Sequence, residues 1–135
     1  MFEYIDFAKE NDLPLIDDCY AMNATGEGEV WLSYYSTFPL VAIRNFQLVQ
    51  VWESFGCISG AFALLEGAVV FSECYTPRQE GSHLLRRTLS QSPQSELLVT
   101  VDEKGQPIVG RFKTAGRGSR FYIWTAAGLY EMALL

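Results

Sequence analysis

The stretch that decides the fold is ELLVTVDEKGQPIVGRFKTAGRGSRFYIWTAAGLYEMALL, residues 96–135. Its first half predicts a β-hairpin that turns at Lys104-Gly105, because glycine tolerates the positive φ of a two-residue turn. The facing residues then include two pairs, Val101 with Ile108 and Glu96 with Lys113. One face is apolar and the other is mixed, as is typical of a half-buried antiparallel pair.

The second half of this stretch predicts another hairpin, which turns at Ala127-Gly128. In that register Ile123 faces Met132 on an apolar face, whereas Tyr122 and Trp124 lie on the opposite face. A one-residue slip would exchange the two faces, so the alternation fixes which side chains share a face.

Length and composition indicate one domain, residues 1–135. Hydrophobic residues make up 49% of the chain, so a core can form without disulfides or metal ions. No apolar run approaches the roughly 20 residues of a membrane span, and we therefore expect no membrane partner.

The amino terminus predicts a cytoplasmic location. Residues 1–12 carry four acidic residues against Lys9, whereas a secretory signal begins with basic residues followed by an apolar core. The three cysteines cannot all pair within one chain, which favours free thiols in a reducing compartment. The glycosylation pattern at Asn23 would then go unused.

The rest of the chain predicts helices and strands in alternation. Helices are expected over residues 2–11, in a second turn over residues 15–22, and over residues 82–89. Strands are expected over residues 30–36 and 41–52, with a further hairpin over residues 57–75 that turns at Glu66-Gly67. Both faces of that hairpin are apolar, so it should be the most buried, although a buried helix over residues 61–65 fits the same run.

Together these segments predict an α+β fold. Its centre is a curved, mostly antiparallel sheet, a meander of hairpins, with one or two amino-terminal helices and a short helix near residues 82–90. The open sheet is preferred because the amino-terminal helix needs a face to cover. A small closed β-barrel is the alternative.

No catalytic constellation emerges from the motifs. His83 is the only histidine, and its spacing from Cys57 and Cys74 matches no compact metal-ligand pattern. Ser59 lies one residue away from the central position that the serine of a nucleophile elbow occupies. We therefore expect no enzyme, no catalytic residue, no metal site and no cofactor.

One segment, residues 113–120, is a candidate anion site. Its two glycines free the backbone, and successive backbone amides can form an anion-binding nest. The candidate anion- or ligand-binding residues are Arg111, Lys113, Arg117 and Arg120. They suit a carboxylate, a phosphate or an acidic protein surface; the alternative is a solvated hairpin connection whose charges keep a sheet edge from aggregating.

Aromatic side chains outnumber those that one inner sheet face needs, so some should lie on the second face. That face is either covered by helices or offered to a partner. The candidate partner-binding residues are Trp31, Tyr35, Tyr122, Trp124, Arg117 and Arg120.

These features predict a non-enzymatic protein–protein interaction module, such as an adaptor, assembly factor or inhibitor. Its partner is another protein or a second copy, in a homodimer that joins the acidic amino-terminal segment to the basic loop. The alternative is a small-ligand domain whose apolar pocket is lined by Tyr34, Trp52 and Tyr122. A net charge of −6 argues against nucleic acid as a partner.

Overall fold

A computed structural model shows the fold and describes residues 4–13, 19–34, 38–53, 55, 60–72, 83–108 and 113–133. The elements, in chain order, are α1 (Tyr4–Glu10), β1 (Cys19–Ala24), β2 (Glu29–Tyr34), β3 (Leu40–Arg44), β4 (Gln47–Trp52), β5 (Phe62–Leu65), β6 (Ala68–Ser72), β7 (His83–Thr88), β8 (Ser95–Val99), β9 (Lys113–Arg117), β10 (Arg120–Thr125) and β11 (Gly128–Met132).

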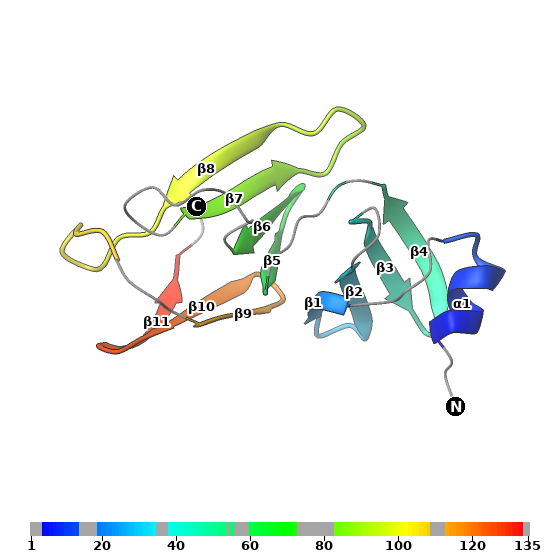
Figure 1. Cartoon of the computed structure of the whole chain (residues 1–135), viewed down its shortest axis with the longest axis horizontal. Coiled ribbons are helices and arrows are strands. Elements are labelled where there is room, and N and C mark those ends of the chain that lie inside the picture. The colour runs from blue at the N-terminus through cyan, green and yellow to red at the C-terminus, as the bar shows by residue number, and fades with distance from the viewer. Residues whose placement is uncertain are drawn as a thin grey trace.

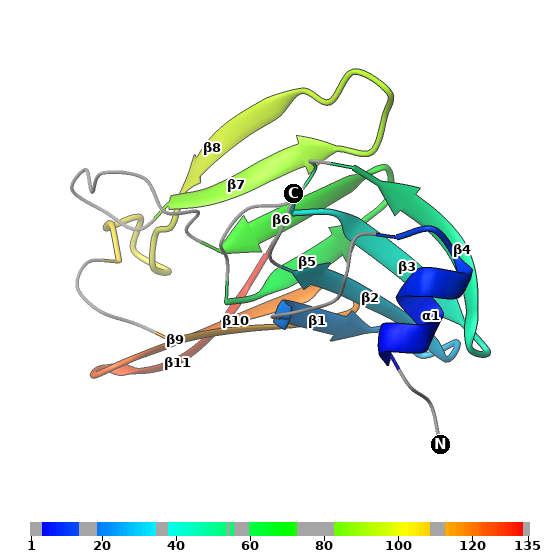
Figure 2. The same cartoon turned by 45° about the vertical axis from the view of Figure 1, so that its right-hand side comes forward.

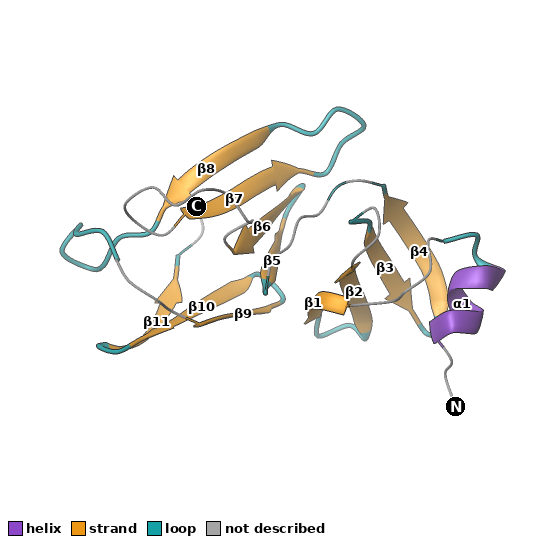
Figure 3. Ribbon diagram, viewed as in Figure 1, coloured by secondary structure: helices purple, strands orange, loops and turns teal. Residues whose placement is uncertain are grey.

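The described strands form three open antiparallel sheets (Figures 1 and 3). The first sheet contains β1 to β4, the central sheet β5 to β8, and the carboxy-terminal sheet β9 to β11. Within each sheet, strands that are consecutive in sequence pair with one another, so the predicted meander of antiparallel hairpins is confirmed. The closed barrel is wrong, because none of these three sheets closes on itself.

Helix α1 covers the first sheet (Figure 2). Phe7 and Ala8 are buried and pack with Tyr34, Val41 and Ile43 of that sheet. The amino-terminal helix over a sheet face is therefore confirmed. It has only seven residues, so the described fold is nearly all β, not the α+β fold that the sequence predicts.

The central sheet is buried on both faces. Phe62 and Phe71 pack toward the first sheet, whereas Ala63 and Val70 pack toward the carboxy-terminal sheet. Phe62 faces Phe71 across the β5–β6 pair, in the register that the sequence predicts. The hairpin is confirmed and the alternative helix over residues 61–65 is wrong.

Two predicted helices are strands instead. Residues 19–24 form β1, and residues 14–18 of the predicted second helix lie outside the described residues. Residues 83–88 form β7, where Leu84 packs toward the carboxy-terminal sheet and Leu85 toward the first sheet. Burial on opposite sides at successive positions is what a strand provides and a helix does not.

The predicted strand over residues 41–52 is a hairpin of β3 and β4. Asn45 and Phe46 form its turn with φ values of 50° and 61°. Two positive φ values in a two-residue connection characterise the type I′ turn, which glycine or asparagine usually signals. The sequence offers only Asn45 as that signal.

The predicted partner of β8 is wrong. Strand β8 pairs with β7, so Glu96 faces Arg86 instead of Lys113. The turn near Gly105 is present, with a φ of 76°, but it closes only a short loop in which Val101 bridges to Pro107. The predicted pairings of residues 109–112 lie outside the described residues.

The last hairpin, β10–β11, is confirmed with its register shifted by two residues. Ile123 faces Tyr130 where Met132 was predicted. The turn moves to Ala126-Ala127, because the hydroxyl of Thr125 accepts a hydrogen bond from the amide of Ala127 at 3.1 Å. A shift of two preserves the faces, so Tyr122 and Trp124 still lie opposite the core-facing side chains.

Candidate interaction site

The outward side of the carboxy-terminal sheet gathers aromatic and basic side chains, and we call it the aromatic face. Its residues are Lys113, Ala115, Arg117, Arg120, Tyr122, Trp124, Leu129 and Glu131. Phe121, Ile123 and Met132 occupy the other side of the same sheet and pack against the central sheet. Alternation along each strand thus separates the packed side from the aromatic face.

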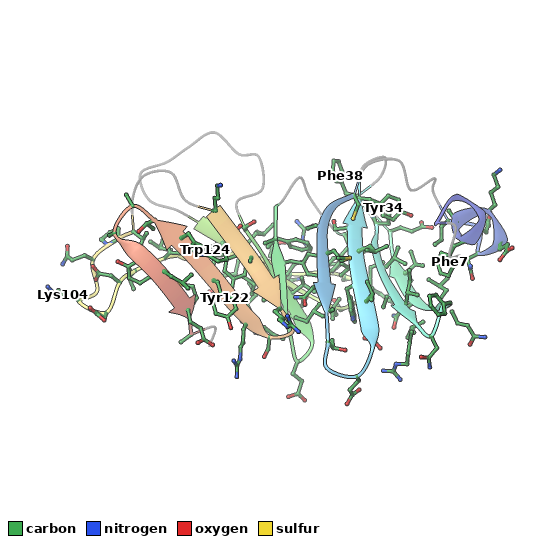
Figure 4. All side chains as sticks on the ribbon, turned by 90° about the horizontal axis from the view of Figure 1, so that it is seen from below. Phe7, Tyr34, Phe38, Lys104, Tyr122 and Trp124 are labelled. Carbon is green, nitrogen blue, oxygen red and sulfur yellow. The ribbon has the colours of Figure 1, made fainter. Side chains whose placement is uncertain are left out.

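Trp124 is the centre of the apolar part of this face. It faces Lys113 on β9 and Leu129 on β11, so the three side chains form a row across the sheet. Trp124 is 43% exposed and Leu129 is 58% exposed. Figure 4 shows Trp124 beside Tyr122, at the opposite end of the molecule from Phe7.

Three exposed cations flank the aromatic side chains. Arg117 faces Arg120 at the β9–β10 turn, and Lys113 lies at the other end of β9. Arg120 lies 3.7 Å from the carboxylate of Glu131, and its pKa is raised by a hydrogen bond to Tyr122 and by the charge of Glu131. Three cations against one carboxylate make this face positive within a chain of net charge −6.

The predicted partner-binding residues are only partly brought together. Tyr122, Trp124, Arg117 and Arg120 share the aromatic face, whereas Trp31 lies in the first sheet. There the ring of Trp31 stacks on that of Trp52, with centroids 5.2 Å apart, and its Nε1 donates to Glu29 at 2.6 Å. Two further candidates, Tyr35 and Arg111, lie outside the described residues.

The loop predicted over residues 113–120 as an anion-binding segment is mostly a strand. Residues 113–117 are strand β9, and only Gly118-Ser119 turn, with a φ of 57° at Gly118. The other glycine allows close packing: a Cβ at Gly116 would overlap the carbonyl oxygen of Phe62 and lie 2.6 Å from its carbonyl carbon. The two glycines therefore place β9 against β5 instead of forming a nest.

Asn23 joins the three sheets, a role that the sequence analysis missed. Its Nδ2 donates to the carbonyl oxygens of Phe62 at 2.8 Å and Gly118 at 3.0 Å, and its Oδ1 accepts from the amide of Gly118 at 2.6 Å. The residue is 2% exposed, so the folded chain has no room for a glycan there. Gly118 lies 95 residues away, and nothing local in the sequence indicates the pairing.

A groove of about 590 Å³ lies between β4 and the turn from β7 to β8. Trp52, Phe55, Leu89 and Pro93 give it apolar walls, and Gln50 and Gln91 are among its polar residues. Of the three aromatic residues predicted to line a pocket, only Trp52 does so. Tyr34 is fully buried in the core beneath α1, where burial raises its pKa to about 12, and Tyr122 lies on the aromatic face.

Two searches over the described residues gave negative findings. No group of three or more His, Cys, Asp or Glu side chains there is arranged to hold a metal ion. No helix in the same ranges combines the length and apolarity that crossing a membrane requires.

Comparison of the chain with curated proteins and with solved structures found no match. Comparison with protein families found one that covers nearly the whole sequence, residues 2–132. The chain belongs to the YxzG family.

Proposed function

We propose that the chain is a non-enzymatic protein–protein interaction module that binds an acidic partner protein on its aromatic face. The observation that carries this proposal is the exposure of Trp124 and Leu129 as neighbours on the aromatic face, next to the β10–β11 turn. Exposing such a pair to water is unfavourable, and tryptophan is among the residues that most often dominate binding energies.

Charge indicates the chemistry of the partner. Lys113 lies beside Trp124, Arg117 and Arg120 lie at the other end of the same face, and all three are exposed. An apolar centre with a charged rim is the usual anatomy of a protein interface. Cations in that rim steer an acidic protein into place, and their contribution weakens as salt rises.

The test is affinity capture from a lysate of the source organism, with the captured proteins quantified by mass spectrometry. Wild type is compared with Trp124→Ala and with Val49→Ala, which removes an equally exposed apolar side chain from the first sheet. We expect one acidic protein to be retained by wild type and Val49→Ala. Its recovery should fall about tenfold or more with Trp124→Ala, as for a central contact residue.

A charge reversal and an increase in salt concentration provide a second test. Arg117→Glu should weaken capture, and raising the salt concentration should weaken the wild-type complex. Capture that Trp124→Ala and Arg117→Glu leave unchanged would rule out this face as the binding surface. A specific partner that binds equally well at high salt would contradict the charge argument.

The groove beside Trp52 supports a second candidate function, binding of a small ligand. Its volume of about 590 Å³ falls within the roughly 300–1,000 Å³ of known ligand sites. Thermal denaturation against a metabolite set tests this candidate, since a bound ligand stabilises the folded state in a saturable way. The substitution Gln91→Ala, at an exposed position of the groove, should reduce that stabilisation without unfolding the protein.

A further inference from the structure

Strand β8 forms the outer edge of the central sheet (Figures 1 and 2). The amide of Thr88 donates to the carbonyl of Gln94 at 3.0 Å, so Gln94 belongs to a hydrogen-bonded pair with β7. Such pairs alternate along an antiparallel ladder. The backbone N–H and C=O groups of Ser95, Leu97 and Val99 therefore point away from β7, toward an edge with which no strand of the described residues pairs.

The same edge carries an apolar stripe. Leu97, Val99 and Val101 are 62%, 55% and 45% exposed, at alternate positions that share one face of the extended chain. Leu98, between them, packs into the core against the carboxy-terminal sheet. Unpaired backbone groups next to exposed apolar side chains are the features that favour pairing with another strand.

The other outer edges are less suited to pairing. In the first sheet, the β3–β4 register shifts between Ala42 and Ile43, so Val49 is bulged out of the ladder on edge strand β4. On β11, the edge of the carboxy-terminal sheet, Glu131 places a charge on the exposed face beside Leu129, whereas the face of β8 that carries Leu97 and Val99 holds no charge. Strand β8 keeps one register over all five pairs with β7, and it contains no proline or lysine.

We propose that β8 pairs with β8 of a second copy of this chain, in an antiparallel homodimer related by a twofold axis. A twofold axis perpendicular to the sheet places residues of the same face opposite one another. Odd-numbered residues of β8 share one face, so odd-numbered residues of one copy pair with odd-numbered residues of the other. The register centred on Leu98 places Leu97 opposite Val99 and Ser95 opposite Val101. It also joins the two central sheets into one continuous sheet.

Charge supports a second copy as the occupant of this edge. Glu96 is the one charged residue of β8, and Arg86 on β7 lies 3.7 Å from its carboxylate. In the proposed register Glu96 faces Thr100 of the other copy and not another Glu96. The one charge on each edge is thus balanced by Arg86 of its own chain, and each copy supplies the unbulged apolar edge that the other requires.

The molar mass of the full chain in solution, measured by analytical ultracentrifugation over a concentration series, tests the proposal. Wild type should form a dimer, and Leu97→Lys should raise its dissociation constant by about tenfold or more. Val49→Lys is the matched control, because Val49 is similarly exposed on the bulged edge and should leave the dimer intact. Circular dichroism should show that both variants remain folded.

A charge exchange tests the register. Val99→Glu alone should also weaken the dimer, whereas Leu97→Lys combined with Val99→Glu should restore it, because each lysine then faces a glutamate of the other copy. A wild-type monomer at all concentrations, or a Leu97→Lys variant that dimerises normally, would overturn the proposal. A double variant that remains monomeric would overturn the register.

The dimer is independent of the proposed function. Trp124 lies on a different sheet, so Trp124→Ala should leave the molar mass unchanged while it reduces partner capture. Loss of dimer and partner together on Trp124→Ala would mean that both use the aromatic face, and this would overturn the assignment to β8.

Discussion

The β5–β6 hairpin and the β10–β11 hairpin have similar lengths but contrasting environments. Phe62 and Phe71 are fully buried, with ring centroids 5.8 Å apart, and the residues between them pack on both sides of the sheet. On β10, Phe121 and Ile123 are fully buried while Trp124 is largely exposed. The β5–β6 hairpin is therefore packed on both faces, whereas the β10–β11 hairpin is packed on one face.

The difference teaches how this small protein can bury a core and still leave one sheet face exposed. The first and carboxy-terminal sheets cover opposite faces of the central sheet, so each outer sheet needs only one apolar face. Helix α1 covers the outward side of the first sheet. The aromatic face has no such cover among the described elements, and its tryptophan remains partly exposed.

The largest effect is expected where the sheets approach most closely. Gly116→Ala places a Cβ against the backbone of Phe62, which cannot rotate away as a side chain can. We expect a loss of more than about 3 kcal/mol in the free energy of unfolding, or failure to fold. Gly60→Ala is the control, since a Cβ there meets nothing within 4 Å. Equal stability of the two variants in urea unfolding would refute this close approach.

The next largest effect is expected at Asn23. Asn23→Ala leaves the amide of Gly118 and the carbonyl of Phe62 without their side-chain partner, at a cost of about 3 kcal/mol. Met22→Ala, at an exposed neighbouring position, should change little.

Replacement by aspartate sharpens the test at this position. At neutral pH, Asn23→Asp should also destabilise the protein, because its carboxylate would face two carbonyl oxygens. Lowering the pH should recover part of the loss, since a protonated carboxyl group can donate to one of those oxygens. Urea unfolding of Asn23→Asp that shows no such recovery would argue against the hydrogen-bond geometry at this junction.

Local pattern predicted the hairpins that turn where the sequence signals a turn. The β5–β6 register followed from the Glu66-Gly67 turn between two apolar runs. The β10–β11 faces followed from alternation, whereas the exact turn was missed because Thr125 selects it through its hydroxyl. The side chains therefore lie on the predicted faces of the sheet, although the predicted register was wrong by two residues.

Pairing between distant segments was less predictable. Strand β8 has an alternating pattern that fits more than one partner, and the Lys104-Gly105 turn suggested the wrong one. Its true partner β7 resembled a helix, because Leu84, Leu85 and Leu89 suit either structure. The three charged residues over 113–120 were noticed, but the packing role of Gly116 depends on Phe62, far away in the sequence.

An effect confined to high pH is expected from the buried tyrosine beneath α1. Burial raises the pKa of Tyr34 to about 12, above the value of about 10 in an unfolded chain. The folded state therefore retains a proton that the unfolded state loses, and stability should fall as pH rises from about 10 to about 12. The total loss is about 3 kcal/mol. Urea unfolding of Tyr34→Phe across this pH range should lack that component, and identical pH dependence in both proteins would contradict the assignment.

The smallest effect on stability is expected at the exposed Trp124. Trp124→Ser removes a side chain whose described cross-strand partners are Lys113 and Leu129, so it should cost about 1 kcal/mol or less. Phe71→Ala, in the central sheet, should cost about 3–5 kcal/mol. If Trp124→Ser proved as destabilising as Phe71→Ala in urea unfolding, Trp124 would be a structural residue. A small cost combined with lost partner capture would instead separate binding from stability, because a surface kept for a partner contributes little to the fold that presents it.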